Sequence, residues 1–350
     1  MSGDEATTPS AKPKASATAT DSPLKMQTAV DSLSSIVPSL SKLTPASLLT
    51  SPDLYSKISA LLRQPNSGAG DNNLCRWLYD TFQSGVVDLQ LLVLRFLPVI
   101  AGVYLSRVAD RKPQAGFEAV LLALYAYETT SRAGKPVSIT IPDLSQPSVY
   151  HEATAKTPGK GPANSAATDP EIAVVSPALE PHGTVRSTRR ARIVGVALEL
   201  FYAKIGHMPV SSKTDFCEFC KVWAGQDGEM YKNFEEGEMC KKLEDGGAKE
   251  EEEGVVEKKN RVEGRVPLSW ELLQPVMRIL GHCLLGPNNN KHVELCNKAN
   301  EACRSLFSRS MHDVNPKAIL PMRSLLRLSK TVMPNHPDPT ELPFSDVISL

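Results

Sequence analysis

The sequence lacks an excess of charge of either sign. Its 350 residues hold 39 Lys and Arg against 39 Asp and Glu, which gives a formal net charge of zero at pH 7. A protein that binds nucleic acid through the phosphate backbone needs a basic excess to release counterions. The balance therefore disfavours a dedicated nucleic-acid-binding protein, and no nucleic acid is expected among the partners.

Long uncharged apolar runs are also missing. The only hydrophobic residues in 1–21 are Ala and the first Met, so no signal peptide is expected there. The most apolar stretch, 86–105, carries Asp88 and Arg95, and charged side chains are costly in the middle of a bilayer. We expect this stretch to be a buried core helix rather than a membrane span.

Common catalytic motifs are absent as well. The run Gly159-Lys160-Gly161 lacks the spacing of a phosphate-binding Walker A loop, and no nucleophile elbow, HExxH pair or kinase motif occurs. The seven His residues are scattered singly, so none is paired at helical spacing to bind a metal. We therefore expect no enzymatic activity, no catalytic residues, no cofactor and no metal site.

What the sequence does contain is a helical pattern over most of its length. Hydrophobic residues make up 41% of the chain, enough for a core. Ser51-Pro52 and Asn72-Asn73 are typical helix starts, and an Asn315-Pro316 pair begins the last helix. Apolar side chains spaced by three or four predict the other helices, near residues 86–109, 117–134, 194–205, 215–223, 268–283 and 295–306. The pattern predicts an all-α fold, an irregular antiparallel helical-hairpin domain with disordered termini.

One short segment has the period of a strand instead. Val137–Ile141 alternates apolar and polar residues and is rich in β-branched side chains, and Pro142 follows it. Ile172–Val175 is a candidate partner strand. We expect one small β-hairpin.

Composition divides the chain into three parts. Residues 1–50 are expected to form a mostly disordered leader, although apolar spacing from Leu24 hints at a short helix there. Residues 51–331 are expected to form the helical domain, and 332–350 a disordered tail. Inside the domain, 153–170 is expected to be a flexible loop, and 235–265, with 11 acids and 7 bases, an acidic flexible insertion. Its run Glu250–Glu253 is interpreted as solvating the loop rather than as a binding site.

Cys217 and Cys220 form the sequence pattern that best fits a chemical role. A Cys-x-x-Cys pair can be half of a zinc site or a redox pair. A closed zinc site needs two more ligands, and the nearest candidates, His207 and Cys240, do not form a second pair. Packing of both thiols in the core is favoured, since free Cys is commonly buried; zinc and redox roles stay open as alternatives. The odd total of seven cysteines suits reduced thiols in the cytosol.

Three weaker candidates remain. Arg186, Arg189, Arg190 and Arg192 are candidates for contact with phosphates of an acidic lipid or nucleic acid, or simply a solvated helix start. Tyr150 and His151 lack a third group to orient them as a catalytic pair, so a rigid extended connector is the favoured interpretation. Ser-Pro and Thr-Pro pairs, which are candidate phosphate acceptors, occur at Thr8, Ser22, Thr44, Ser51, Thr157 and Ser176.

The segment ITIPDLSQPSVYHE, residues 139–152, resembles the signature of the hyccin family. Other runs agree in the same order: RWLYDTFQSG (76–85), LRFLPVIAGVYL (94–105), EAVLLALYAYE (118–128), ELFYAKIGHMPVSS (199–212), Cys217 with Cys220, and GRVPLS (264–269). The resemblance covers roughly residues 50 to 331. In its Ala- and Ser-rich leader, its acidic insertion over 235–263 and its short tail, the chain is similar to plant members of the family.

The resemblance implies a function that composition and spacing do not reveal. Hyccins are non-catalytic subunits of the plasma-membrane phosphatidylinositol 4-kinase alpha complex, which makes phosphatidylinositol 4-phosphate. The implied partners are a tetratricopeptide-type scaffold protein, the kinase and a membrane-anchored adaptor. The implied location is the cytosol and the cytoplasmic face of the plasma membrane, with membrane contact mainly through partners.

Two other functions are kept as alternatives. One is a peripheral membrane-binding adaptor that uses the arginines of 186–192, and the other is a Cys-dependent redox or zinc protein. If the scaffold function is correct, apolar surface should be exposed in the isolated chain. We expect it on the first helices and on residues 268–331.

Overall fold

The computed structural model describes residues 21–38, 44–45, 48, 51–109, 114–141, 171–225, 267–286 and 292–332. Within them lie ten α-helices, one short 3-10 helix and a single two-stranded antiparallel sheet. The predicted all-α fold with one small β element is therefore confirmed. The predictions for 153–170, 235–265 and 333–350 fall outside the described residues.

Along the chain, a first set of helices is followed by the two strands and then by a second set of helices. The first set is α1 (Asp21–Ile36), α3 (Pro52–Arg63), α4 (Asn73–Gln83), α5 (Val87–Ala109) and α6 (Ala115–Ser131). The strands are β1 (Val137–Ile141) and β2 (Glu171–Ser176). The second set is α7 (Arg190–Ala203), η3 (Ile205–His207), α8 (Val210–Ala224), α11 (Trp270–Leu285), α12 (Val293–His312) and α13 (Pro316–Val332).

The helix starts predicted from Ser51 and Asn72 are confirmed by their hydrogen bonds. The Ser51 hydroxyl accepts a bond from the Leu54 amide at 3.3 Å, and the Asn72 side chain accepts one from the Cys75 amide at 3.0 Å. Each bond satisfies an amide that has no partner inside its helix. Gly225, at φ +59°, ends α8 in the left-handed conformation that glycine adopts without strain.

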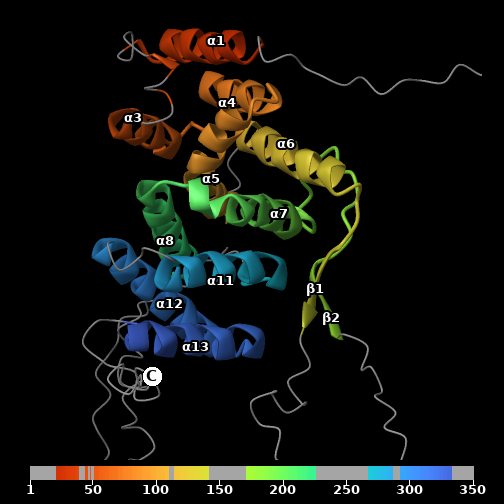
Figure 1. Cartoon of the computed structure of the whole chain (residues 1–350), viewed down its shortest axis with the longest axis vertical. Helices are drawn as coiled ribbons and strands as arrows, with labels where there is room; N and C mark the ends of the chain where they lie inside the picture. Colours follow the sequence, from red (N-terminus) through yellow and green to blue (C-terminus); the bar gives the residue numbers. More distant parts are fainter. Residues whose placement is uncertain are drawn as a thin grey trace, which may run out of the picture.

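The helices pack in two neighbouring columns (Figure 1). One column runs α1, α4, α6, α7, α11 and α13, and each of these helices packs against the next. The other contains α3, α5, α8 and α12, with α5 against both α3 and α8, and α8 against α12. The result is an elongated stack of helices without a fixed repeat.

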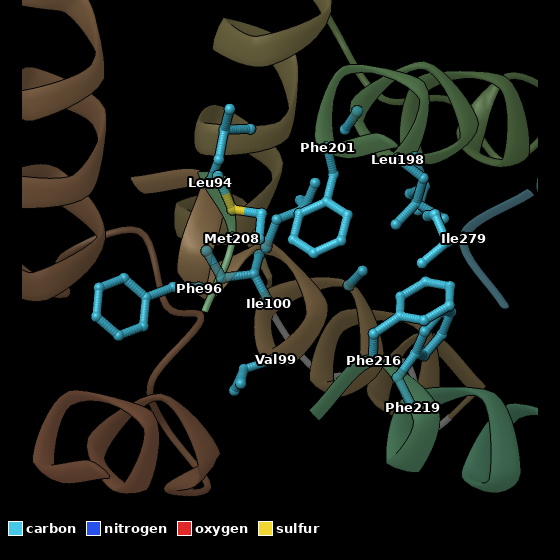
Figure 2. Close-up of a cluster of buried hydrophobic side chains, with 14 of the residues drawn as sticks. Leu94, Phe96, Val99, Ile100, Leu198, Phe201, Met208, Phe216, Phe219 and Ile279 are labelled. Atoms are coloured by element: carbon cyan, nitrogen blue, oxygen red, sulfur yellow. The ribbon is translucent and has the colours of Figure 1, made fainter. Parts of the chain in front are cut away.

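Helix α5 lies in the middle of this stack. By length and composition alone its segment Val87–Val108 is able to cross a membrane, but 72% of the most apolar window is buried inside the protein. Figure 2 shows how Leu94 and Ile100 of α5 lie near Phe201 of α7, with Phe216 of α8 and Ile279 of α11 beyond it. This burial supports the expected core helix.

Polar bonds hold α3 to α5 and α8 at the edge of the core. The Tyr55 hydroxyl donates to Asp215 Oδ2 at 2.6 Å, and Arg63 pairs with Asp215 Oδ1 at 2.8 Å. The Ser212 hydroxyl donates to the Arg95 carbonyl oxygen at 2.7 Å. The two bonds to Asp215 join α3 to α8, and the Ser212 bond joins α8 to α5.

The expected boundary of the packed fold at residue 51 is too late. Helix α1 buries Ala29, Val30 and Leu33, and the Trp77 indole donates a 2.9 Å hydrogen bond to the Ala29 carbonyl oxygen. A buried indole N–H needs an acceptor, and the backbone of α1 supplies it. The short helix that the apolar spacing from Leu24 predicted within the leader is therefore present over residues 21–36 and packs on the helical domain.

Candidate functional site

The two strands form a ribbon that stands beside the helices (Figure 1). Residues 137–141 and 171–176 are here called the β ribbon. The strands are antiparallel, with Ser138 opposite Val174, Ile139 opposite Ala173 and Thr140 opposite Ile172. Among the described elements, β1 and β2 pack mainly on each other.

Both faces of the β ribbon expose large apolar side chains. Residues directly opposite each other in an antiparallel pair share a face, so Ile172 and Val174 lie on one face and Ile139 on the other. Their exposed fractions are 64%, 60% and 52%. A strand on the surface of a protein normally has one polar face, and a two-stranded ribbon alone is only marginally stable in water. Apolar side chains on both faces therefore make the β ribbon a candidate binding surface.

The β ribbon is joined to the helices by a buried ion network. Arg132 follows the last turn of α6, and its guanidinium donates to Ser176 Oγ at the end of β2 at 2.8 Å and to Glu199 Oε2 of α7 at 2.8 Å. It also pairs with Glu128. Burial on its own lowers the pKa of Arg132, but the bonds to Glu199 and Glu128 outweigh it and raise the pKa. One cation thus connects α6, α7 and β2.

The segment after β2 is fixed along α6. The Leu179 amide donates to the Gly134 carbonyl oxygen at 2.9 Å, and the Tyr125 hydroxyl donates to the Glu180 carbonyl oxygen at 2.8 Å. The His182 ring stacks on Tyr125 with centroids 5.1 Å apart. The end of the β ribbon nearest the helices is therefore held firmly, while its apolar faces remain in solvent.

Three of the four arginines that were candidates for phosphate contact, or for a solvated helix start, bond to other parts of the protein. Arg190 Nε donates to the Tyr104 hydroxyl at 3.0 Å, and Arg192 donates to the Pro177 carbonyl oxygen at 2.9 Å. Arg189 lies 2.7 Å from His182 Nδ1. Arg186 is exposed, and its backbone carbonyl oxygen accepts from the Arg189 amide at 3.0 Å. The side chains point to different neighbours, so they do not form one basic surface.

Cys217 and Cys220 lie in the core, on the inner side of α8. Both are fully buried, as are Cys283 of α11 and Cys303 of α12. A hydrogen bond with Cys283 together with burial raises the pKa of Cys217, and burial raises that of Cys220. A redox or metal-binding thiol needs the opposite shift, because the thiolate is the reactive form.

The cysteines have no metal-binding arrangement within the described ranges. No group of three or more His, Cys, Asp or Glu residues there is placed to hold a metal ion. His207, one of the two further ligands considered, is exposed in η3, and Cys240 lies outside the described residues. The geometry agrees with the favoured interpretation, in which both thiols pack in the core.

The remaining sequence candidates divide between described and undescribed positions. Gly159-Lys160-Gly161, Tyr150, His151, Glu250–Glu253, Thr8 and Thr157 lie outside the described residues. Ser22 is exposed in the first turn of α1, and Ser51 is half-buried at its helix cap. Ser176 is buried against Arg132. A kinase therefore has no access to the Ser176 hydroxyl while the β ribbon stays attached.

A cavity of about 500 Å³ between α1 and α4 was not anticipated from the sequence. It is lined by Lys25, Ser32, Arg76, Trp77 and Asp80, among others. Its volume is in the range of ligand pockets. Because the lining mixes both charges and the cavity depends on where α1 lies, no residue pattern in the sequence reveals it.

Sequence reasoning also missed the exposure of the β ribbon, since it placed exposed apolar surface on the first helices and on 268–331. Trp270, Leu320 and Leu328 in the latter block are indeed exposed. The available signal was the apolar run Ile172–Val175 opposite the apolar positions of Val137–Ile141, which puts apolar side chains on both faces of a two-stranded sheet.

The chain was compared with models of known protein families. The Hyccin model matches residues 40–342, which contain both strands and every described helix except α1.

Proposed function

This chain belongs to the hyccin family, and from that membership we propose that it is a non-catalytic subunit of a phosphatidylinositol 4-kinase alpha complex. In this role it stabilises the kinase assembly at the plasma membrane and supports synthesis of phosphatidylinositol 4-phosphate. The single observation that carries the proposal is the family match over 40–342. The family is consistent with a non-catalytic adaptor.

The fold suits a protein that works by binding other proteins. Elongated stacks of helices offer large surfaces, and a stable interface of about 800 Å² per partner needs no catalytic or cofactor motif. The β ribbon adds apolar side chains that the chain itself leaves in solvent. A helical tetratricopeptide-type scaffold is the proposed direct partner, and the kinase and a membrane-anchored adaptor complete the proposed assembly.

Charge supports recruitment to the membrane by partners rather than by direct lipid binding. Clusters of basic residues attract anionic lipid headgroups, but the formal net charge of this chain is zero and three of the four arginines in 186–192 contact the protein itself. The proposed location is therefore the cytosol and the cytoplasmic face of the plasma membrane, with partners making most of the membrane contact.

Reconstitution tests the proposal. The purified full chain is mixed with the purified tetratricopeptide-type scaffold subunit of the same organism, with and without the kinase, and separated by size exclusion. We expect the chain and the scaffold to elute together in a fixed ratio at micromolar concentration and to retain the kinase. Separate elution of chain and scaffold under these conditions contradicts the proposal.

A vesicle experiment separates the proposal from direct membrane binding. The chain alone, at physiological salt, should not float with vesicles that contain phosphatidylserine, whereas the full assembly with its membrane-anchored adaptor should. Flotation of the chain alone would instead favour a peripheral membrane adaptor.

A further inference from the structure

We propose that the cavity between α11 and α13 binds a small amphiphilic anion, with one carboxylate or phosphate head group on an apolar chain, and that Arg278 contacts the head group. The inference is independent of the proposed function, because it rests on the side chains of one cavity and not on the family of the chain. It assigns to this chain a ligand site that no sequence pattern reveals.

The cavity lies where the second half of α11 meets α13 (Figure 1). Its volume is about 510 Å³, which is in the range of ligand pockets. Met277 and Leu285 of α11 and Pro321 and Leu325 of α13 form its apolar part. Ligand pockets are typically apolar, with a small number of polar groups that orient the ligand. This space is here called the α11–α13 cavity.

The polar part of the α11–α13 cavity has the charge that suits an anion. Among the described residues that line it, Arg278 is the only one with a permanent charge, and none is acidic. Tyr202, His282 and Ser324 are the other polar side chains there. Burial, and then the positive charge of Lys213, lower the pKa of His282, so positive charge extends beyond Arg278. The lining therefore favours an anion over a metal ion or an organic cation.

Arg278 is held in place without a hydrogen-bond or ion-pair partner in the described part of the chain. Its guanidinium lies over the ring of Tyr202, with Cζ 4.9 Å from the ring centroid, and a cation–π contact leaves the N–H donors unused. Its Nε is buried without an acceptor among the described residues, which is costly for a donor on a charged group. The side chain as a whole is only half-buried and lines the cavity. A head group in the cavity can therefore accept from the guanidinium.

Glu199, the acidic side chain that acts on Arg278, is already bound. Its carboxylate accepts from Arg132 at 2.8 Å. Burial outweighs the attraction of Glu199 and lowers the pKa of Arg278, although an arginine stays protonated at neutral pH. An anion in the α11–α13 cavity would supply further counter-charge in a place that is partly shielded from water, where an ion pair is stronger than in bulk solvent.

Neither half of such a ligand satisfies the cavity by itself. An inorganic anion would bind Arg278 but leave the walls around Met277 and Leu325 in water. A neutral apolar molecule would cover these walls but displace water from Arg278 without giving it a partner. A molecule with both an anionic head and an apolar chain uses the two parts of the cavity at once.

Titration calorimetry on the purified full chain tests the inference. The probes are decanoate and decyl phosphate, used at concentrations where both stay monomeric. They share the apolar chain and differ in the head group, so they distinguish a carboxylate ligand from a phosphate ligand. We expect at least one of them to bind saturably at one site. Acetate, inorganic phosphate and decanol each lack one half of the ligand and should bind at least about 10-fold more weakly.

Two variants act on the two parts of the cavity. Arg278→Met removes the charge but keeps an unbranched side chain beside Tyr202, and it should weaken binding of the anionic probe at least about 10-fold. Binding of decanol should not change in this variant, because decanol carries no charge. Ser324→Trp introduces a large side chain at the cavity from an exposed position of α13 and should weaken binding of the anionic probe and of decanol. Circular dichroism and the Tm show whether both variants are folded.

The matched control is Arg304→Met on α12. Arg304 is also half-buried, and its Nε also lacks an acceptor among the described residues, but Arg304 does not line the α11–α13 cavity. Arg304→Met should bind the anionic probe like the wild type. Equal weakening in Arg278→Met and Arg304→Met would contradict a specific role of Arg278.

The remaining outcomes also decide the matter. If neither decanoate nor decyl phosphate binds saturably, the inference is overturned. If a probe binds but neither Arg278→Met nor Ser324→Trp weakens it, the probe binds elsewhere and the α11–α13 site is wrong. If only Ser324→Trp weakens it, the cavity binds apolar chains and the role of Arg278 is wrong. Each of these failures leaves the proposed function untouched, because co-elution with the scaffold subunit does not depend on this cavity.

Discussion

Arg132 Nη2 and Glu199 Oε2 lie 2.8 Å apart, and this bond joins the end of α6 to the middle of α7. The two side chains are only 11% and 7% exposed. Without Glu199, Arg132 keeps Glu128 as a counter-charge but loses a charge-assisted hydrogen bond that is largely shielded from water, and such a bond is more costly to lose than an exposed ion pair.

Glu199→Ala should therefore destabilise the fold by about 1.5–3 kcal/mol. Urea unfolding followed by circular dichroism measures the change in the free energy of unfolding. The matched control is Glu301→Ala, which breaks the Lys221–Glu301 pair of the same 2.8 Å length, with side chains 36% and 51% exposed. Exposed pairs contribute about 0–1 kcal/mol. Equal losses of unfolding free energy in the two variants would show that the buried pair stabilises the fold no more than the exposed pair does.

The helical part of this fold is predictable because its signals are local. Ser51 and Asn72 cap the helices that follow them, and the apolar spacing of α5 reflects its burial on nearly all sides. Each of these features is encoded within one or two turns of chain. The strand Val137–Ile141 and its partner were predictable for the same reason, from alternation and β-branching.

The parts that were not predictable depend on contacts between distant segments. Trp77 binds the backbone of α1, 48 residues away in the chain, and this contact makes α1 part of the fold. The arginines of 186–192 looked alike in the sequence, but Arg190 contacts Tyr104 and Arg192 contacts Pro177. The direction and the partner of each arginine side chain depend on how the helices pack, and this packing cannot be read from the order of residues.

The Ser51 cap gives a second test. Ser51→Ala removes the acceptor of the Leu54 amide and should cost about 1 kcal/mol, whereas Ser51→Asp keeps an acceptor at a helix N-terminus and should stay close to the wild type. Urea unfolding of both variants provides the measurement. Similar losses for Ala and Asp would mean that the cap does not stabilise α3. The same experiment shows whether negative charge at this Ser-Pro site is tolerated.

A close approach of two helices makes Gly195 a third test. A Cβ atom on Gly195 of α7 would collide with the Glu271 backbone carbonyl of α11. Gly195→Ala should destabilise the fold by about 1–3 kcal/mol through overpacking, despite the better helix propensity of Ala. Gly206, which has nothing within 4 Å of its Cβ position, is the control. Gly206→Ala is expected to be neutral, and a neutral Gly195→Ala would disprove the close packing of α7 on α11.

His282 of α11 should make stability sensitive to acid. Burial, and then the nearby positive charge of Lys213, lower its pKa below the ordinary value. The unfolded chain therefore binds this proton more readily than the folded protein. The contribution of neutral His282 to stability is fully present above the unfolded pKa of about 6.5. It is lost as the pH falls from there through the lower pKa of the folded protein.

The variant His282→Gln removes this contribution. Unfolding free energies measured at pH 7.5 and pH 5.5 should differ less in His282→Gln than in the wild type. Lys213→Gln should reduce the difference partly, because Lys213 is the smaller of the two causes. An identical difference in the wild type and in His282→Gln would show that protonation of His282 is not linked to unfolding.

The buried cysteines provide a test that bears directly on function. Cys217 and Cys220 are fully buried, and their raised pKa values keep them as thiols, whereas Cys296 is half-buried. Among the cysteines of the described residues, alkylation with iodoacetamide at pH 8, followed by peptide mass spectrometry, should label Cys296 first. Cys217 and Cys220 should react at least about 100-fold more slowly, since they become accessible only when the structure opens, and should react readily in 8 M urea.

Rapid labelling of Cys217 and Cys220 in the folded protein would contradict this arrangement. It would show that the thiols are accessible as reactive groups and would favour the Cys-dependent alternative. Slow labelling has the opposite meaning, because thiols held as protonated groups among Phe216, Phe219 and Cys283 contribute packing to the helix stack.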